Sequence, residues 1–284
     1  MIVPMKKAAV IARAQDAASA LEGLRDLGVL HVEHQKMPQG ASLDSLREET
    51  ALLREALHIL SVTGVALDSA KSATDLDGSA AARHVVDLHK RLEHLKDYAS
   101  SLKSAIAAWE PWGDFDPAAI TALQSRGIWV SLFQAPAHEL KKTPSDAAVE
   151  VLRRDRGMVY GVIVSPRKIE SPFKEIALPK MGLGSMRARL REDQGKIANL
   201  EASLRRALAY QRILSQALTL REASLHFEEA RLGMGQEGEL VFITGFIPAD
   251  AERGLLDAAR RHAWAAAVMD LSPDEVGPTL LRNP

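Results

Sequence analysis

The sequence predicts an α+β protein in which two small α/β lobes are joined by a long antiparallel helical coiled coil or bundle, which makes the molecule elongated. Three observations predict this class. Residues 5–34 and 240–271 each have the pattern strand, helix, strand. Leucine heptads fill much of the chain between them, and residues 111–182 again mix helix and strand patterns.

Composition limits the possible classes of protein. A length of 284 residues favours about two domains. The chain is 46% hydrophobic and only 5% aromatic, which favours helices. A net charge of −1 gives no support to a nucleic-acid binder or a basic membrane-surface protein. The absence of cysteine excludes disulfides, thiolate catalysis and cysteine zinc sites, and suits a reducing compartment.

No stretch reaches the roughly 18 apolar residues that span a bilayer, and no signal-peptide pattern is present, so we expect this chain to be soluble.

The first strand–helix–strand unit begins with "MKKAAVIAR", an apolar run typical of a buried strand. Asp16 is the expected N-cap of the helix that follows, and Gly28 is expected to end it in left-handed geometry. In the next strand, "VLHVEH", Leu30 and Val32 share one face.

The second unit repeats this plan near the C-terminus. "LVFITGFI" is strand-like, Pro248 opens a helix with Asp250 and Glu252 in its first turn, and "AWAAAVMDL" supplies another strand. A unit of about 30 residues rarely folds alone. We therefore expect the two units to share one sheet, as a split βαβ, ferredoxin-like proximal lobe made of residues 1–40 with 233–284.

The helical rod is expected to comprise residues 41–110 with 183–232. Its outbound part covers 42–63 and 79–110, and one long helix over about 184–231 returns. The return helix has mixed d positions, because Asp193, Arg221 and Glu228 do not suit an apolar seam. We expect a third helix or local unzipping there, with bending concentrated at these positions and at residues 64–78.

Residues 111–182 predict a distal α/β lobe. Asp116 and Pro117 begin a short helix that Gly127 ends, and "IWVSLFQ" alternates as a strand. "AAVEVLRRDRGMVYGVIVS" predicts a hairpin that turns at Asp155–Gly157. "FKEIALP" adds a further strand.

Two patterns that resemble functional motifs are better explained by structure. "GMGQEG" matches the dinucleotide fingerprint in letters, but a helix precedes it and a strand follows, the reverse of the order that places a pyrophosphate at a helix N-terminus. His84, His89 and His94 are spaced by five, so they do not share a helix face as metal ligands do. We predict no catalytic residue, no cofactor and no metal.

Candidate partner-binding residues gather in the distal lobe. Arginines cluster at the predicted hairpin tip, where they could bind an acidic partner, and some of the lobe's aromatic residues could anchor an interface while most form the core. The candidates are Trp112, Phe115, Trp129, Phe133, Arg153, Arg154 and Arg156.

Four segments in register resemble subunit I of archaeal and bacterial V-type (A/V-type) ATPases, the counterpart of subunit a of the eukaryotic vacuolar enzyme. They are "IVPMKKAAVIA" with "ALEGLRDLGVLHVE", "WEPWGDFDPAAITALQSRGIWVSLFQ", "ELVFITGFIPADAERGLLDAA" and "PTLLRNP". The resemblance covers essentially the whole chain. The heptads contribute little to it, since they recur in unrelated proteins.

The resemblance implies a non-catalytic stator subunit of a rotary ATPase that pumps protons or sodium ions. It implies a place on the cytoplasmic face of the membrane and partners that include peripheral-stalk E/G-type heterodimers, rotor and central-stalk-cap subunits, and the protein's own C-terminal membrane domain. That domain carries the ion path and is expected to follow a junction at Pro278, Leu280 and Leu281. Nucleic acid is not an expected partner.

Two alternatives stay open from the residues alone. Paired βαβ units with "LGVLHVE" also resemble ACT-type regulatory domains, which bind small molecules between sheets. A free-standing coiled-coil scaffold would instead self-associate through its seam.

Overall fold

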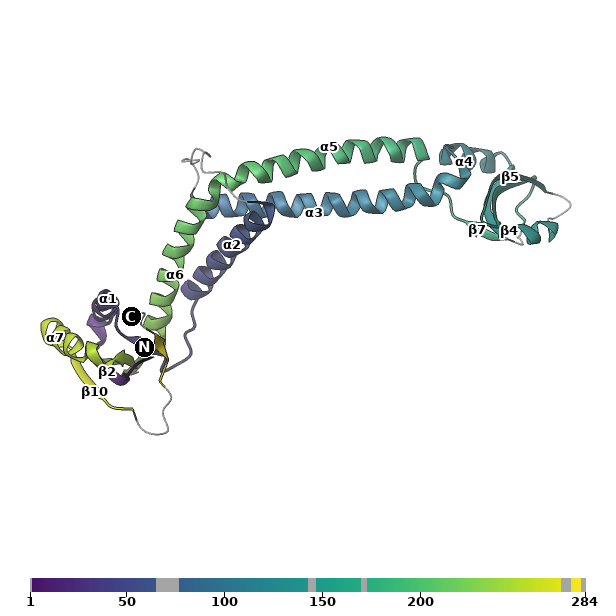
Figure 1. The fold of residues 1–284 in the computed structure, drawn as a ribbon. Helices are drawn as coiled ribbons and strands as arrows, with labels where there is room; N and C mark the ends of the chain where they lie inside the picture. The colour runs from purple at the N-terminus through teal and green to yellow at the C-terminus, as the bar shows by residue number, and fades with distance from the viewer. Residues whose placement is uncertain (1, 65–76, 143–146, 170–172, 272–276, 282–284) are drawn as a thin grey trace. The chain divides into compact units, whose positions relative to one another are not determined.

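The computed structural model describes residues 2–64, 77–142, 147–169, 173–271 and 277–281. The chain is α+β with antiparallel sheets, as the sequence predicts (Figure 1). It divides into two compact units, residues 1–86 with 207–284 and residues 87–206. Among the described residues, no helix combines the length and the apolar character needed to cross a bilayer.

The first unit contains a sheet with the strand order β10-β2-β9-β3, to which β8 adds at β9. All of its pairings are antiparallel. The bounds are β2 Met5–Arg13, β3 His31–Glu33, β8 Gly235–Glu237, β9 Leu240–Pro248 and β10 Ala265–Met269. The two strand–helix–strand segments therefore interleave in one sheet, with β2 of the first lying between β9 and β10 of the second.

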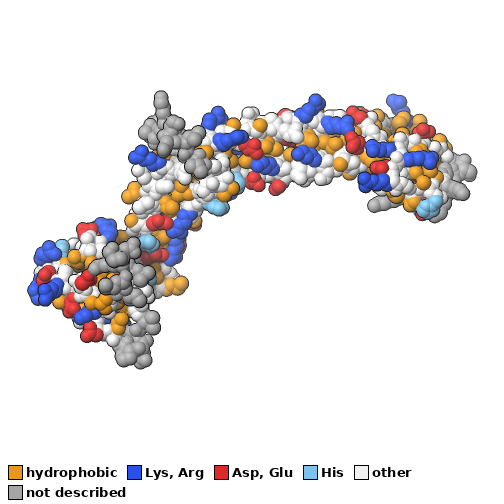
Figure 2. All heavy atoms as spheres, in the orientation of Figure 1, with side chains coloured by type: hydrophobic (Ala, Val, Ile, Leu, Met, Phe, Trp, Pro, Cys, Tyr) orange, Lys and Arg blue, Asp and Glu red, His pale blue; other side chains and the backbone are white. Residues whose placement is uncertain are grey.

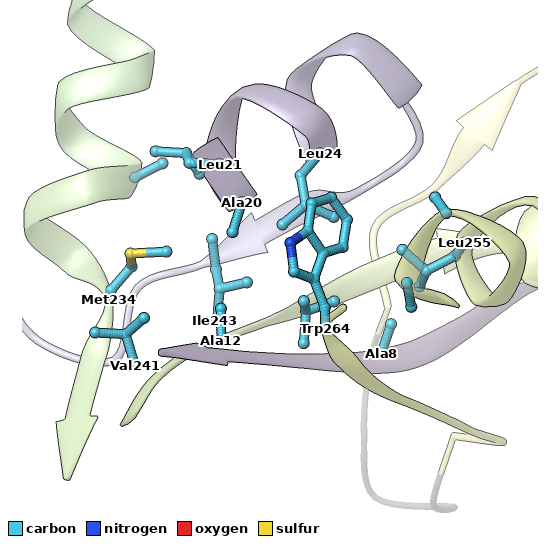
Figure 3. Packing of buried hydrophobic residues seen from close by; sticks show 14 of the residues in the cluster. Ala8, Ala12, Ala20, Leu21, Leu24, Met234, Val241, Ile243, Leu255 and Trp264 are labelled. Atoms are coloured by element: carbon cyan, nitrogen blue, oxygen red, sulfur yellow. The ribbon is translucent and has the colours of Figure 1, made fainter. Parts of the chain in front are cut away.

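Alternation along β2 determines which side of this sheet forms the core. Ala8, Val10 and Ala12 are buried, whereas Ile11 and Arg13 are exposed. The buried side packs against α1 (Ala17–Leu27) and α7 (Glu252–His262), through side chains such as Leu24 and Leu255 (Figure 3).

The ends of α1 follow the sequence with one difference. Gly28 ends the helix in left-handed geometry at φ 63°, as expected. Asp16 occupies the N-cap position, but its carboxylate makes no cap hydrogen bond; it accepts one from Arg13 Nε at 2.8 Å. The residue was predicted correctly and its contact was not. The turn before α1 is the 3-10 segment Ala14–Asp16, and a similar one, Ala249–Ala251, precedes α7.

The "GMGQEG" stretch joins a helix to a hairpin, in the order that the sequence indicates. Helix α6 (Gln211–Gly233) ends at the first glycine of this stretch. Strand β8 is connected to β9 by a turn in which Gly238 has a φ of 59°. A Cβ at Gly235 would overlap the ring of Phe242. The absence of a side chain at Gly235 therefore permits close packing of β8 (Gly235–Glu237) against β9.

The prediction of a single long return helix is wrong. The chain forms α5 (Leu183–Ala207), a 3-10 turn (Leu208–Tyr210) and then α6. Helix α6 packs against α2 (Ala41–Thr63) in the first unit. In the second unit, α5 runs beside residues 87–109 of α3 (Gly78–Trp109), where Lys96 pairs with Glu201 at 3.2 Å (Figure 1).

The three d positions that do not suit an apolar seam have separate explanations. Arg221 Nε lies 2.7 Å from Glu49 Oε2 on α2, and Glu228 accepts a hydrogen bond from Ser42 Oγ at 2.6 Å. Both therefore link α6 to α2. Asp193 is fully buried on α5, where Arg189 Nε lies 3.1 Å from its Oδ2. Of the expected bending sites, residues 65–76 lie outside the described residues.

The second unit contains a four-stranded antiparallel sheet in the order β5-β6-β4-β7. Its strands are β4 Trp129–Pro136, β5 Ala148–Asp155, β6 Met158–Ser165 and β7 Lys174–Ile176. Helix α4 (Pro117–Ser125) precedes it, and two 3-10 segments, Glu110–Trp112 and Ala137–Lys142, complete the lobe. Asp116 caps α4 by accepting a hydrogen bond from the Ala118 amide at 3.0 Å, as predicted.

Candidate partner-binding surfaces

The three candidate arginines lie together at the tip of the β5–β6 hairpin. The turn is at Arg156–Gly157, within the predicted stretch, with φ of 44° and 82°. Left-handed geometry is costly for arginine and suits glycine or asparagine, so this turn carries about 1 kcal/mol of strain at Arg156. Arg153, Arg154 and Arg156 are all exposed. Among the described residues, none of the three is held in an ion pair.

A β-bulge lies beside this tip. The pairing of β5 with β6 shifts between Val151 and Arg153, so Leu152 is the extra residue. Its side chain is 47% exposed. The tip therefore combines three cations with one apolar side chain, a composition suited to an acidic partner that also offers an apolar contact.

Two of the aromatic candidates form part of the core. Phe133 has no exposed surface and stacks on Phe173 with the ring centroids 4.8 Å apart. Trp112 is 8% exposed, and its indole N–H donates to the Gly161 carbonyl at 3.3 Å. Neither side chain offers a partner a contact area in this structure, because both are already covered.

Phe115 and Trp129 keep partial exposure. Phe115 contacts Trp109 edge-on, with the ring centroids 6.2 Å apart. The Trp129 ring lies 5.9 Å from the ammonium of Lys168, within the range of a cation–π contact. These two remain the aromatic residues available for an interface.

The structure does not bring all the candidates together. Trp129 pairs with Ser165 at one end of the β4–β6 ladder, whereas Pro136 pairs with Met158, next to the arginine turn, at the other. The eight-residue strand between them spans roughly 25 Å at the usual rise per residue. The arginine tip and the Trp129 region are thus separate surfaces of one sheet.

The predicted junction residues lie at a second, smaller pairing. β11 (Leu280–Leu281) pairs antiparallel with β1 (Ile2–Val3), so the two ends of the described chain meet. Leu280 is 39% exposed, and Pro278 is half-buried. Sequence reasoning missed this ladder, because two-residue strands have no periodicity to detect.

The histidines of α3 occupy exposed or partly exposed positions. His84 contacts Tyr210 edge-on at 6.3 Å, and His94 is exposed. Across the described part of the chain, no group of three or more His, Asp or Glu side chains could hold a metal.

Ion pairs between helices form a second feature that the sequence did not reveal. Arg54 reaches Glu222 at 2.7 Å and Arg47 reaches Glu229 at 3.2 Å, both joining α2 to α6. Figure 2 shows both signs of charge interspersed over the helices. Their partners lie at least 168 residues apart in sequence, so no local spacing could have indicated them.

The carboxylate of Glu228 has a strongly lowered pKa. Hydrogen bonds from Arg231 and then from Ser42 lower the pKa of Glu228 from its usual 4.5 to about 2. The Arg231 pair is bidentate in character, at 2.7 and 2.8 Å. The carboxylate stays ionised at neutral pH and ties the start of α2 to the end of α6.

These features define a mixed α+β protein in which Phe115, Trp129 and the three arginines are the partner-binding candidates that keep exposed surface. Comparison with known proteins gives a more particular result. The chain is 27% identical over 312 aligned positions to V-type ATP synthase subunit I 1 of Treponema pallidum, and 23% identical over 288 to V-type ATP synthase subunit I of Borreliella burgdorferi. The resemblance stated from the sequence is confirmed: this chain is similar to subunit I along its whole length.

Both alignments cover 100% of this chain but only 49% and 46% of the relatives, so the chain spans about half their length. No protein-family model matches it. Among solved structures, the cytoplasmic N-terminal domain of subunit I, homolog of subunit a, of V-ATPase aligns over 93% of this chain and 99% of that one, with 17% identity and a TM-score of 0.38. The sequence similarity, rather than this superposition, identifies the relatives.

Proposed function

We propose that this chain is a non-catalytic stator subunit of a rotary V-type ATPase that translocates protons or sodium ions. Its similarity over the full chain to two subunit I proteins supports this proposal above any other observation. In this role it anchors the peripheral stalks to the membrane sector and resists the torque of the rotor.

The proposal includes a division into three functional parts. These are a proximal lobe of residues 1–40 with 233–284, a helical connector of 41–110 with 183–232, and a distal lobe of 111–182. The interleaved order β10-β2-β9-β3 supports a split βαβ, ferredoxin-like plan for the proximal lobe. The pairing of α2 with α6, and of α3 with α5, supports a coiled-coil or bundle connector.

The arginine tip is the proposed contact for an E/G-type peripheral-stalk heterodimer. Exposed arginines without intramolecular ion pairs lose little on binding and attract an acidic surface, while Leu152 supplies an apolar contact. Phe115 and Trp129 are the proposed aromatic anchors elsewhere on the lobe.

We place the chain on the cytoplasmic face of the membrane, next to rotor and central-stalk-cap subunits. The relatives are about twice as long, which leaves room for the proposed membrane domain in the full protein. Pro278, Leu280 and Leu281 are its proposed junction, and the β1–β11 ladder would support them.

A binding assay with a purified peripheral-stalk heterodimer tests this function. The wild-type chain should bind at low salt and more weakly as salt rises, since Arg153, Arg154 and Arg156 carry the contact. Changing all three to Glu should weaken binding at least tenfold. A matched control changes Arg253, Arg260 and Arg261 to Glu, three exposed arginines of α7. Absence of wild-type binding at low salt would contradict the stator role, and equal losses in both triple variants would contradict the assigned contact.

A further inference from the structure

We propose that a recess beside Trp129 binds a single carboxylate group carried on a short apolar stem. The recess has a volume of about 220 Å³ and lies in the second unit, where α4 meets the end of the β4–β6 ladder. Nothing in the proposed stator role requires it.

Strand register builds the recess at the end of the lobe's core. Trp129 pairs with Ser165, and Ser131 pairs with Ile163, so these four residues share one face of the sheet. Farther along that face, Phe133 and Val159 are fully buried in the core. At the recess the row of apolar side chains gives way to two hydroxyls.

One cation lies at the recess. The ammonium of Lys168 lies 5.9 Å from the Trp129 ring centroid, and its side chain makes no ion pair with a described carboxylate. Gln124 of α4 also lines the recess, and its side-chain amide can donate hydrogen bonds. The Ser165 hydroxyl already donates to the Arg167 carbonyl at 2.7 Å. We assign the contacts to an incoming anion to the Lys168 ammonium and the Gln124 amide.

This set of groups selects the ligand. A carboxylate oxygen only accepts hydrogen bonds, which suits these donors, and its single charge matches a single lysine. A phosphate dianion is usually held by arginine forks or several cations, and among the described lining residues Lys168 is the single cation.

The apolar lining residues and the volume of the recess indicate the size of the ligand's apolar stem. The Trp129 ring, Ile163 and Ile169 offer apolar surface for a few methylene groups. At about 30 Å³ for each water, the recess holds roughly seven water molecules, which corresponds to an acid of about six to eight heavy atoms. A butyrate-sized acid fits, as does the side chain of a glutamate presented by another protein.

The experiment follows the indole N–H resonances of the full chain with labelled tryptophan. Trp129→Phe assigns the Trp129 signal among the four tryptophans. Butyrate is titrated in one arm, and a purified peripheral-stalk heterodimer in the other. We expect a saturable shift of the Trp129 signal in at least one arm, with affinity reduced at least tenfold by Lys168→Gln. Lys180→Gln, a change to another exposed lysine of the same unit, should leave the affinity unchanged.

The outcomes separate the source of the carboxylate from the proposal itself. A shift with butyrate alone identifies a small-molecule site, and a shift with the heterodimer alone identifies an acidic side chain of the partner. If no Trp129 shift saturates in either arm, or if Lys168→Gln and Lys180→Gln have equal effects, the proposal is wrong. The stator role is judged by heterodimer binding itself, so it can hold while the recess fails this test.

Discussion

The two helix pairs, α2 with α6 and α3 with α5, differ in how well they are packed. In the α2–α6 pair, Leu43, Leu53 and Leu60 have no exposed surface, and neither has Leu214. In the α3–α5 pair, Leu92, Leu102 and Leu204 are also buried, but Leu95, Ile197 and Leu200 are only half-buried, and a shallow hollow of about 400 Å³ lies beside Leu95 and Leu200. The apolar seam of the α3–α5 pair is thus interrupted near Leu95 and Leu200.

The polar residues of the two pairs differ in the same direction. On α6, Arg221 and Glu228 reach across to α2. On α5, the ion pairs of the buried Asp193 go to Arg189 and Lys196, both on its own helix. A polar residue in a helical seam can therefore link two helices or only occupy space between them. Which of the two it does depends on whether its charged partner lies on the other helix or on its own.

The largest expected effect on stability comes from truncating one leucine in each helix pair. Leu60→Ala should lower the free energy of unfolding of the first unit by about 3 kcal/mol, because it leaves a cavity in a closed core. Leu95→Ala should cost the second unit about 1 kcal/mol, because its side chain is already half in water. Hydrogen exchange resolved by helix measures each unit separately, and equal costs would contradict the difference in packing.

The buried carboxylate of Asp193 gives the next largest effect. Asp193→Leu should stabilise the α3–α5 pair by about 1–2 kcal/mol, since the carboxylate is desolvated and Oδ1 has no hydrogen-bond partner. Thr50→Val is the matched change in the other pair. Thr50 is also buried and donates only to the Leu46 carbonyl of its own helix, at 2.7 Å, so we expect a change near zero. Chemical denaturation of both variants checks this, and a destabilised Asp193→Leu protein would show that the carboxylate supports the seam.

The link that Glu228 makes between α2 and α6 should depend on pH. Its folded pKa lies below its unfolded value, so its contribution to stability is complete above pH 4.5 and is lost as the pH falls towards about 2. Glu228→Gln should cost about 1 kcal/mol at pH 7. The difference from wild type should shrink as the pH falls through that window. Denaturation at pH 7, 5 and 3 measures it, and a difference independent of pH would exclude the carboxylate as its origin.

The smallest expected effect is that of the exposed ion pairs. A double-mutant cycle on Arg54 and Glu222, which are 2.7 Å apart, should give a coupling of about 0.3–0.5 kcal/mol that decreases with salt. The Lys96–Glu201 pair, at 3.2 Å, is the counterpart in the other helix pair and should give less. A larger coupling for Lys96–Glu201 would reverse this part of the comparison.

Much of the fold could be predicted from local sequence. Strand β2 was placed correctly because residues 5–13 contain an apolar run, and the end of α1 because Gly28 takes the left-handed geometry expected of it. The split of the return helix was missed. Residues 207–211 contain neither glycine nor proline, so nothing local marks the 3-10 turn.

The candidate site was predictable only in part. The hairpin turn was found because Asp155–Gly157 carries turn-forming residues and short runs of strand formers flank it. The separation of buried Phe133 from half-exposed Trp129 depends on which strand lies beside β4, and this is a long-range property. The Lys168 contact was missed for the same reason, since that residue comes after the end of β6.

The β1–β11 ladder has a mechanical consequence. Ile2 and Leu281 face each other, and Val3 faces Leu280 one step inward. Tension that draws the two ends apart would therefore load the backbone hydrogen bonds one after another, as a zipper, instead of all at once in shear. Such a ladder opens at low force. It would therefore separate before the pairing of β2 with β9, which covers nine positions, is disturbed.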